Sequence, residues 1–70
     1  MKIIEIEEEY IRLCDLLKFA GAAETGGQAK LIITSGRVKL NGEPCLLRGK
    51  KIRPGDAAEY DGKEYGVRRK

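Results

Sequence analysis

The residues best suited to chemistry in this chain are seven basic side chains between positions 30 and 53. They are Lys30, Arg37, Lys39, Arg48, Lys50, Lys51 and Arg53. Glu43 is the one acidic residue in the same window, which therefore carries a net charge of +6. Ammonium and guanidinium groups concentrated in one stretch typically bind phosphates. The window predicts a polyanion-binding surface, and ordinary solubilising charge is the alternative.

The rest of the chain is not basic. Residues 1–29 carry three basic and six acidic side chains, and residues 54–70 carry four of each. The net charge of the whole chain is only +3. Because the positive charge is segregated and not spread, a polyanion-binding face fits the sequence better than general solubility does.

Other chemistries find little support in the sequence. The chain has no histidine, and its two cysteines, Cys14 and Cys45, show no metal-ligand spacing and no disulfide framework. General-base catalysis would need a carboxylate, lysine, tyrosine or cysteine, and Gly26-Gly27 lacks the spacing of a Walker phosphate loop. We therefore expect no enzyme, no cofactor and no metal, and two reduced, partly buried thiols.

Length sets the scale of the molecule. Seventy residues make one domain, which buries only about 60% of the surface that the unfolded chain exposes. No apolar run approaches the ~20 residues of a membrane helix, and the first residues lack the apolar core of a signal peptide. We expect a single monomeric domain over residues 1–70, soluble and cytoplasmic, with no membrane partner.

Helical periodicity appears first in the N-terminal half. Apolar residues repeat at helical spacing and are Ile11, Leu13, Leu16, Leu17 and Ala20. Three glutamates at positions 7–9 precede them and suit the positive end of a helix dipole. The pattern predicts a first helix over about residues 9–20, ended by Gly21.

A second helix is expected to begin at a capping box, Thr25-Gly26-Gly27-Gln28. Such a cap stabilises a helix by ~0.5–2 kcal/mol. The residues expected to face the core are Ala29, Ile32 and Ile33, which leaves Lys30 and Thr34 on the exposed side. Gly36 is expected to end this helix.

The period changes from 3.6 to 2 after Gly36. Arg37 and Lys39 alternate with apolar residues, so both are expected on the outward side of one strand. Asn41-Gly42 predicts a tight hairpin turn. The return strand is expected over residues 43–47, and Pro44, which cannot donate a ladder hydrogen bond, marks it as a sheet edge or a bulge.

The remaining elements are short. A strand at a sheet edge is predicted over residues 2–7, and two more over 57–60 and 63–67, joined at Asp61-Gly62. Residues 48–51 are expected to form a basic loop. The tail, residues 68–70, is expected to fray.

Taken together, these motifs resemble a known family over roughly residues 10–61. The matching residues are Arg12, Leu13, Leu17 and Gly21; Thr25, Ala29, Leu31 and Ile32; Gly36, Val38, Leu40, Asn41 and Gly42; and Gly55 and Asp56. The pattern is similar to the RNA-binding domain named after the small-subunit ribosomal protein S4, also called the alpha-L motif. The segment TGGQAK looks most like its small, free-standing bacterial subgroup.

The resemblance implies an α+β fold, with two helices packed on a small antiparallel sheet. It also implies RNA contacts along the second helix and the strand and loop after it. Arg12 matches the family's first-helix arginine, although Asp15 at i+3 offers it an ion pair. Many members carry an arginine where this chain has Gly26, so the start of the second helix would bind phosphate through backbone N–H groups. Cys14 stands where an aspartate is usual, which puts any contact built around that acid in doubt.

The expected function is non-catalytic binding of structured RNA, ribosomal RNA or a ribosome-associated state above all. The candidate RNA-binding residues are Arg12, Gly26, Gly27, Lys30, Arg37, Lys39, Arg48, Lys50, Lys51 and Arg53. All four aromatic residues lie outside the basic window, which favours contacts to phosphates and 2′-hydroxyls over base stacking. The alternative is a protein–protein interaction module that uses the acidic N-terminal strand or an exposed sheet edge.

Overall fold

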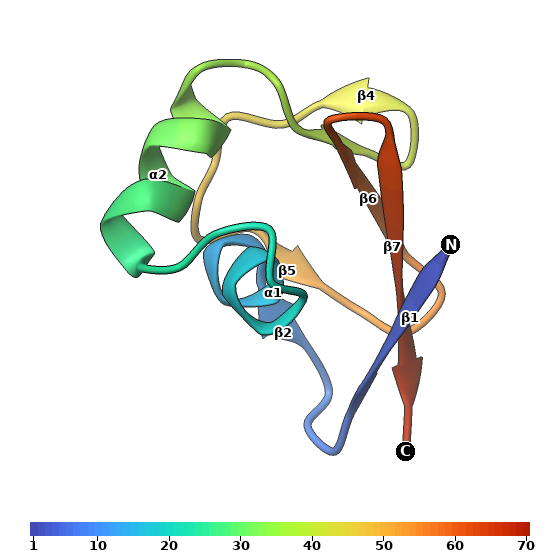
Figure 1. The fold of residues 1–70 in the computed structure, drawn as a ribbon. Coiled ribbons are helices and arrows are strands. Elements are labelled where there is room, and N and C mark those ends of the chain that lie inside the picture. The colour runs from blue at the N-terminus through green and yellow to red at the C-terminus, as the bar shows by residue number, and fades with distance from the viewer.

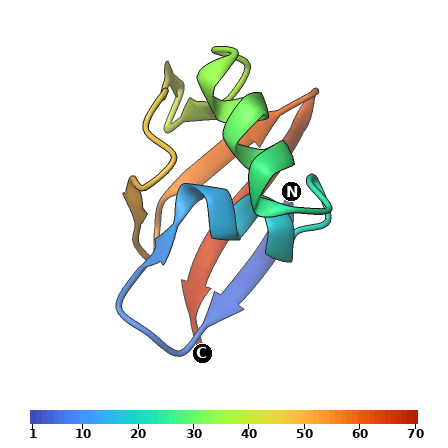
Figure 2. The same cartoon turned by 90° about the vertical axis from the view of Figure 1, so that its left-hand side faces the viewer.

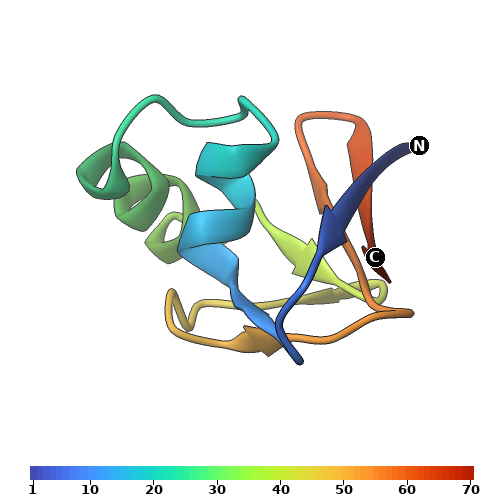
Figure 3. The same ribbon diagram turned by 90° about the horizontal axis from the view of Figure 1, so that it is seen from below.

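Two helices cover one side of a five-stranded sheet in the computed structural model, which describes residues 1–70 (Figures 1 and 3). The elements are β1 (Lys2–Ile6), β2 (Ile11–Arg12), α1 (Leu13–Phe19), α2 (Gly26–Thr34), β3 (Lys39–Leu40), β4 (Glu43–Pro44), β5 (Lys51–Ile52), β6 (Ala57–Tyr60) and β7 (Lys63–Arg69). The sheet has the order β1-β7-β6-β3-β4, and β2 and β5 form a separate two-stranded ribbon. The α+β fold class is confirmed.

The N-terminal strand β1 lies beside β7 and runs parallel to it, while every other pair is antiparallel. The sheet is therefore mixed and not purely antiparallel as the resemblance implied, because the pattern of a single strand does not show the direction of its partner. The expectation of a frayed tail is wrong: the Lys70 N–H donates to the Ile6 carbonyl at 2.8 Å, and Arg68 pairs with Glu5 at 3.0 Å. The tail is held because β7 extends to Arg69 along β1.

Helix α1 begins at Leu13, later than predicted, and the three glutamates at positions 7–9 lie in the bend before β2. The reason is tertiary. Ile11 and Arg12 pair with Ile52 and Lys51 in the β2–β5 ribbon, so they are extended and not helical. The three glutamates therefore do not lie in the first turn of the helix, because strand pairing with a distant segment decides where α1 starts.

Helix α2 begins as predicted. The Thr25 hydroxyl accepts a hydrogen bond from the Gln28 N–H at 3.1 Å. The Gln28 side chain accepts in turn from the Glu24 N–H at 2.7 Å, one residue earlier than in the usual capping box. Gly36 follows the helix with φ +83°, a conformation that favours glycine.

The predicted hairpin turn is confirmed, with φ of 51° at Asn41 and 87° at Gly42. Strand β4, however, ends at Pro44 and does not continue to Leu47. Pro44 lies on the sheet edge as predicted, and the chain leaves the sheet after it. The connection from β4 to β5 is therefore a six-residue segment, residues 45–50, without strand pairing.

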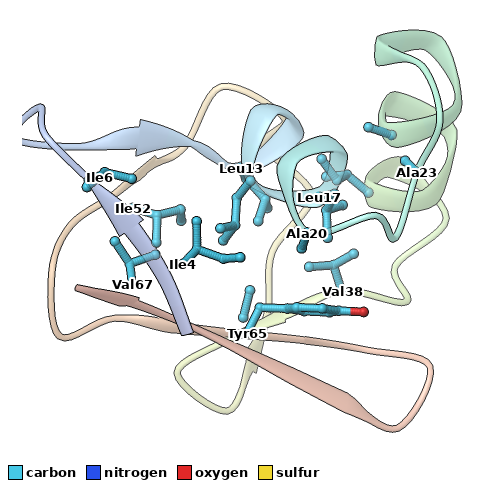
Figure 4. Close-up of a cluster of buried hydrophobic side chains, with 14 residues drawn as sticks. Ile4, Ile6, Leu13, Leu17, Ala20, Ala23, Val38, Ile52, Tyr65 and Val67 are labelled. Carbon is cyan, nitrogen blue, oxygen red and sulfur yellow. The ribbon is translucent and has the colours of Figure 1, made fainter. Parts of the chain in front are cut away.

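The core lies between the helices and the sheet (Figure 4). It contains 14 buried apolar residues, of which the largest fully buried ones are Leu13, Leu16, Leu17, Ile33, Val38 and Ile52. Burying one such side chain contributes ~1.5–3 kcal/mol. These residues come from α1, α2, β5 and the segment before β3, so the core fixes the elements that carry the basic window. No helix combines the length and apolar composition needed to cross a membrane.

Candidate nucleic-acid interface

A shallow groove of about 690 Å³ lies between α2 and the connection from β4 to β5. Its lining residues are Lys30, Thr34, Leu46, Leu47, Arg48, Gly49, Lys50, Lys51 and Arg53. Five of them are cations and none is acidic. We call these five, Lys30, Arg48, Lys50, Lys51 and Arg53, the basic groove. Figure 2 shows the side of the molecule that carries α2 (green), with the connection from β4 to β5 beside it.

The cations of the basic groove have no acidic partners within the molecule. The two salt bridges of the structure join Arg68 to Glu5 and Lys70 to Glu7, at the β1–β7 end of the chain. All five groove cations are exposed. Their charges are therefore available to an external anion, and five such charges at one groove match a chain of phosphates.

Backbone hydrogen bonds anchor the loop of the groove to the start of α1. The Leu13 and Cys14 N–H groups donate to the Lys50 and Arg48 carbonyls at 2.9 and 3.1 Å. Since α1 has no side-chain cap, these two carbonyls satisfy N–H groups that would otherwise lack a partner. The loop is therefore held by the helix, and its side chains project from a fixed backbone.

Arg12 joins this basic surface through the β2–β5 ribbon, where it lies directly opposite Lys51. The ion pair with Asp15, which was the alternative role for Arg12, does not form, since neither residue takes part in a salt bridge. Arg12 is exposed. In the sequence, Arg12 precedes the basic window by 18 residues. The pairing of β2 with β5 brings it next to Lys51, a residue of that window.

Tyr10 is a neighbour of the groove that the sequence did not indicate. The Lys51 ammonium lies 4.9 Å from the centroid of the Tyr10 ring, within cation–π range. The two residues are 41 positions apart, and only the pairing of β2 with β5 brings them together. An aromatic ring therefore borders the basic surface, although none lies inside the basic window of the sequence.

The start of α2 leaves its backbone open. Gly26 and Gly27 are exposed, and a Cβ built on Gly26 would meet no atom within 4 Å. The first N–H groups of a helix have no partner inside it. Lys30 follows Gly26 at i+4 and so lies on the same helix face. This face leads from the open backbone to the basic groove.

A family model described as the S4 domain matches residues 4–68, nearly the whole chain. The chain belongs to the S4 domain family. The relatives include a Bacillus subtilis protein named "Probable ribosome maturation protein RlbA", 39% identical over 59 residues, which cover 84% of this chain and 83% of the relative. An Escherichia coli protein named "Putative RNA-binding protein YbcJ" is 40% identical over 58 residues, 83% of each chain. Family and relatives support RNA binding as the general function.

Within this S4 domain, Arg37 and Lys39 lie apart from the basic groove. Arg37 is exposed just before β3, so the strand that was expected to carry both residues begins only at Lys39. Lys39 lies directly opposite Glu59 of β6. Residues that lie opposite in a ladder share one side of the sheet, so a carboxylate accompanies the Lys39 charge. Neither residue lines the groove.

Asn41 has a structural role in the S4 domain beyond its turn. Its side-chain amide donates to the Asp56 carboxylate at 3.1 Å, and its side-chain oxygen accepts from the Ala57 N–H at 3.0 Å. The second Asp56 oxygen accepts from the Arg53 N–H at 2.8 Å. Asn41 and Asp56 therefore join the β3–β4 hairpin to the turn that carries Arg53, which explains both residues without RNA.

Proposed function

We propose that this S4 domain binds structured RNA without catalysing a reaction, and that the basic groove is its main contact surface. The observation that carries the proposal is the gathering of five unpaired cations from α2 and the 48–53 segment around one groove. Phosphates of a folded RNA are the polyanion that fits such a surface in a member of this family.

The flanks of the groove extend the proposed contact. Arg12 would add a cation beside Lys51, and the open backbone at Gly26 and Gly27 would hold a phosphate at the start of α2. Arg37 and Lys39 are outlying contacts in this proposal, because neither lines the groove and Lys39 lies opposite Glu59 in the β3–β6 ladder. The main proposed contacts are therefore Lys30 and the four cations of the 48–53 segment.

Ribosomal RNA, free or in a ribosome-associated state, is the proposed target. The support is the name of the B. subtilis relative, which refers to ribosome maturation, together with its 39% identity over most of both chains. Such a target would place the protein in the cytoplasm. Crosslinking in cells, followed by sequencing of the bound RNA, tests the target. Reads concentrated at one ribosomal RNA locus support it, and even coverage of all transcripts contradicts it.

Charge reversal tests the surface. We expect Lys30→Glu with Lys50→Glu to abolish binding of a structured ribosomal RNA fragment at low salt. The control is Lys63→Glu with Arg69→Glu, which changes the net charge equally at exposed positions of β7. Equal loss in both double variants would mean that net charge alone drives binding and that the groove is not the site.

A protein partner is a second candidate, and the free edge of β1 favours it. β1 pairs with β7 on one side only and forms the outer strand of the sheet. An extended peptide would add to this edge without occupying the groove. A complex with a purified ribosomal protein that persists after nuclease treatment would support this candidate. Complexes that dissociate on nuclease treatment would contradict it.

A further inference from the structure

A second hollow of about 690 Å³ lies on the outer side of α1, next to the basic groove. It is lined by Glu8, Tyr10, Ile11, Arg12, Asp15, Lys18 and Phe19. Its volume falls within the ~300–1,000 Å³ of pockets that hold small ligands. The sequence suggested no such site, because its two aromatic residues are nine positions apart in the chain and outside the basic window.

The most unusual feature of the hollow is Phe19, which is 69% exposed. Asp15 and Phe19 are separated by one helical turn (i, i+4) and so lie on one exposed face of α1, and Arg12 precedes the helix at its N-cap. An exposed phenylalanine in a small domain presents a large apolar ring to water, and no residue of this chain covers it. Phe19 is therefore available to stack on a planar group.

The charges around the hollow differ from those of the groove. Two cations, Arg12 and Lys18, and two carboxylates, Glu8 and Asp15, line the hollow, and none of the four takes part in a salt bridge. The carboxylates disfavour a phosphate inside the hollow, whereas they accept hydrogen bonds from the N–H groups of a base. Carboxylates and stacking aromatics together recognise bases that have left a helix.

The hollow adjoins the basic groove through two contacts of Lys51, a groove residue. Lys51 lies over the Tyr10 ring and opposite Arg12, and both of these residues line the hollow. An RNA strand with its phosphates on the groove would therefore pass the mouth of the hollow. The two strands of the β2–β5 ribbon each contribute to one site: Arg12 of β2 lines the hollow, and Lys51 of β5 lines the groove.

From this arrangement we infer that the hollow receives a single unpaired base of the bound RNA, stacked on Phe19. The base is one whose Watson–Crick edge carries adjacent N–H donors, so guanine fits Glu8 and Asp15 better than uracil does. The inference rests on the proposed function, since the phosphates beside the base are held by the basic groove. It adds to that function a preference for a bulged or flipped nucleotide.

The test uses three RNA hairpins with one common stem: fully paired, with one bulged guanosine, and with one bulged uridine. The wild-type protein should bind the guanosine bulge most tightly. Phe19→Leu keeps the apolar bulk and removes the stacking ring, and should weaken binding of that hairpin by about 5- to 150-fold, the range of one base–aromatic stack. It should leave the paired hairpin unaffected. Phe19→Trp should retain the preference, and Asp15→Asn should reduce the preference of guanosine over uridine.

The outcomes separate the inference from the proposed function. If the wild-type protein binds all hairpins and Phe19→Leu has no effect, the base site is overturned and RNA binding stands. Phe19 would then contact a protein partner or have no binding role. Equal weakening of the paired and bulged hairpins also overturns it. Failure of the wild-type protein to bind any hairpin at low salt overturns both.

Discussion

Arg12 and Lys51 lie directly opposite each other in the β2–β5 ribbon, as two like charges without an acidic partner. Like charges at opposite ladder positions destabilise a sheet, so this pair costs folding free energy. A small domain has little stability to spare. The pair is understandable if an external anion bridges both side chains, and this relationship links the fold to the proposed RNA contact.

Removing one of these two charges should make the fold more stable and RNA binding weaker. We expect Arg12→Gln to raise the free energy of unfolding by ~0.2–1 kcal/mol, because the repulsion with Lys51 is lost. Affinity for structured RNA should fall in the same variant. Urea denaturation and RNA titration measure the two quantities. Arg37→Gln serves as control, since Arg37 lies outside any ladder, and its unfolding free energy should not change. A less stable Arg12→Gln would contradict this account of the pair.

Gly26→Arg tests the start of α2. A side chain fits at this position, since a Cβ there meets nothing within 4 Å. The added guanidinium would contact a phosphate next to the helix N-terminus, so affinity should rise and the salt dependence should steepen by ~0.7–0.9 in log–log slope, the effect of one phosphate. Thermal unfolding should show a fold at least as stable, because arginine favours a helix more than glycine does. An unchanged slope would place the start of α2 outside the RNA contact.

Asn41→Ala should destabilise the fold by ~1–3 kcal/mol, because the Asp56 carboxylate and the Ala57 N–H lose their partner and alanine disfavours φ 51°. Chemical denaturation measures the loss. Binding by the folded fraction should be preserved, since no RNA contact is assigned to Asn41. If affinity fell while stability stayed constant, Asn41 would be a reader of RNA and not a structural clamp.

Local patterns in the sequence predicted the elements that local chemistry decides. The Thr25 cap, the Asn41-Gly42 turn and the basic window all depend on neighbouring residues, and the structure contains the first two as predicted. The family resemblance supplied the arrangement of helices and sheet. Contacts between distant segments were missed, because the pairing of β1 with β7 leaves no signature in either strand.

The same limit applies to the candidate site. Charge alone identified the residues of the basic groove, but it also favoured Arg37 and Lys39, and only the β3–β6 ladder shows Glu59 beside Lys39. Tyr10 and Phe19 lie outside the basic window in the sequence, so charge did not indicate either of them. The β2–β5 ribbon, two residues long in each strand, was too short to predict and is what brings Tyr10 to Lys51.

The salt dependence of RNA binding tests the central claim most directly. If about five phosphates are neutralised, log K should fall with log salt at a slope of roughly −3.5 to −4.5. Lys30→Gln with Lys50→Gln should make that slope shallower by ~1.4–1.8, the effect of two phosphate contacts. Lys63→Gln with Arg69→Gln, which removes the same charge from β7, should leave it unchanged. A slope equally reduced in both variants, or unchanged in the first, would contradict a site at the basic groove.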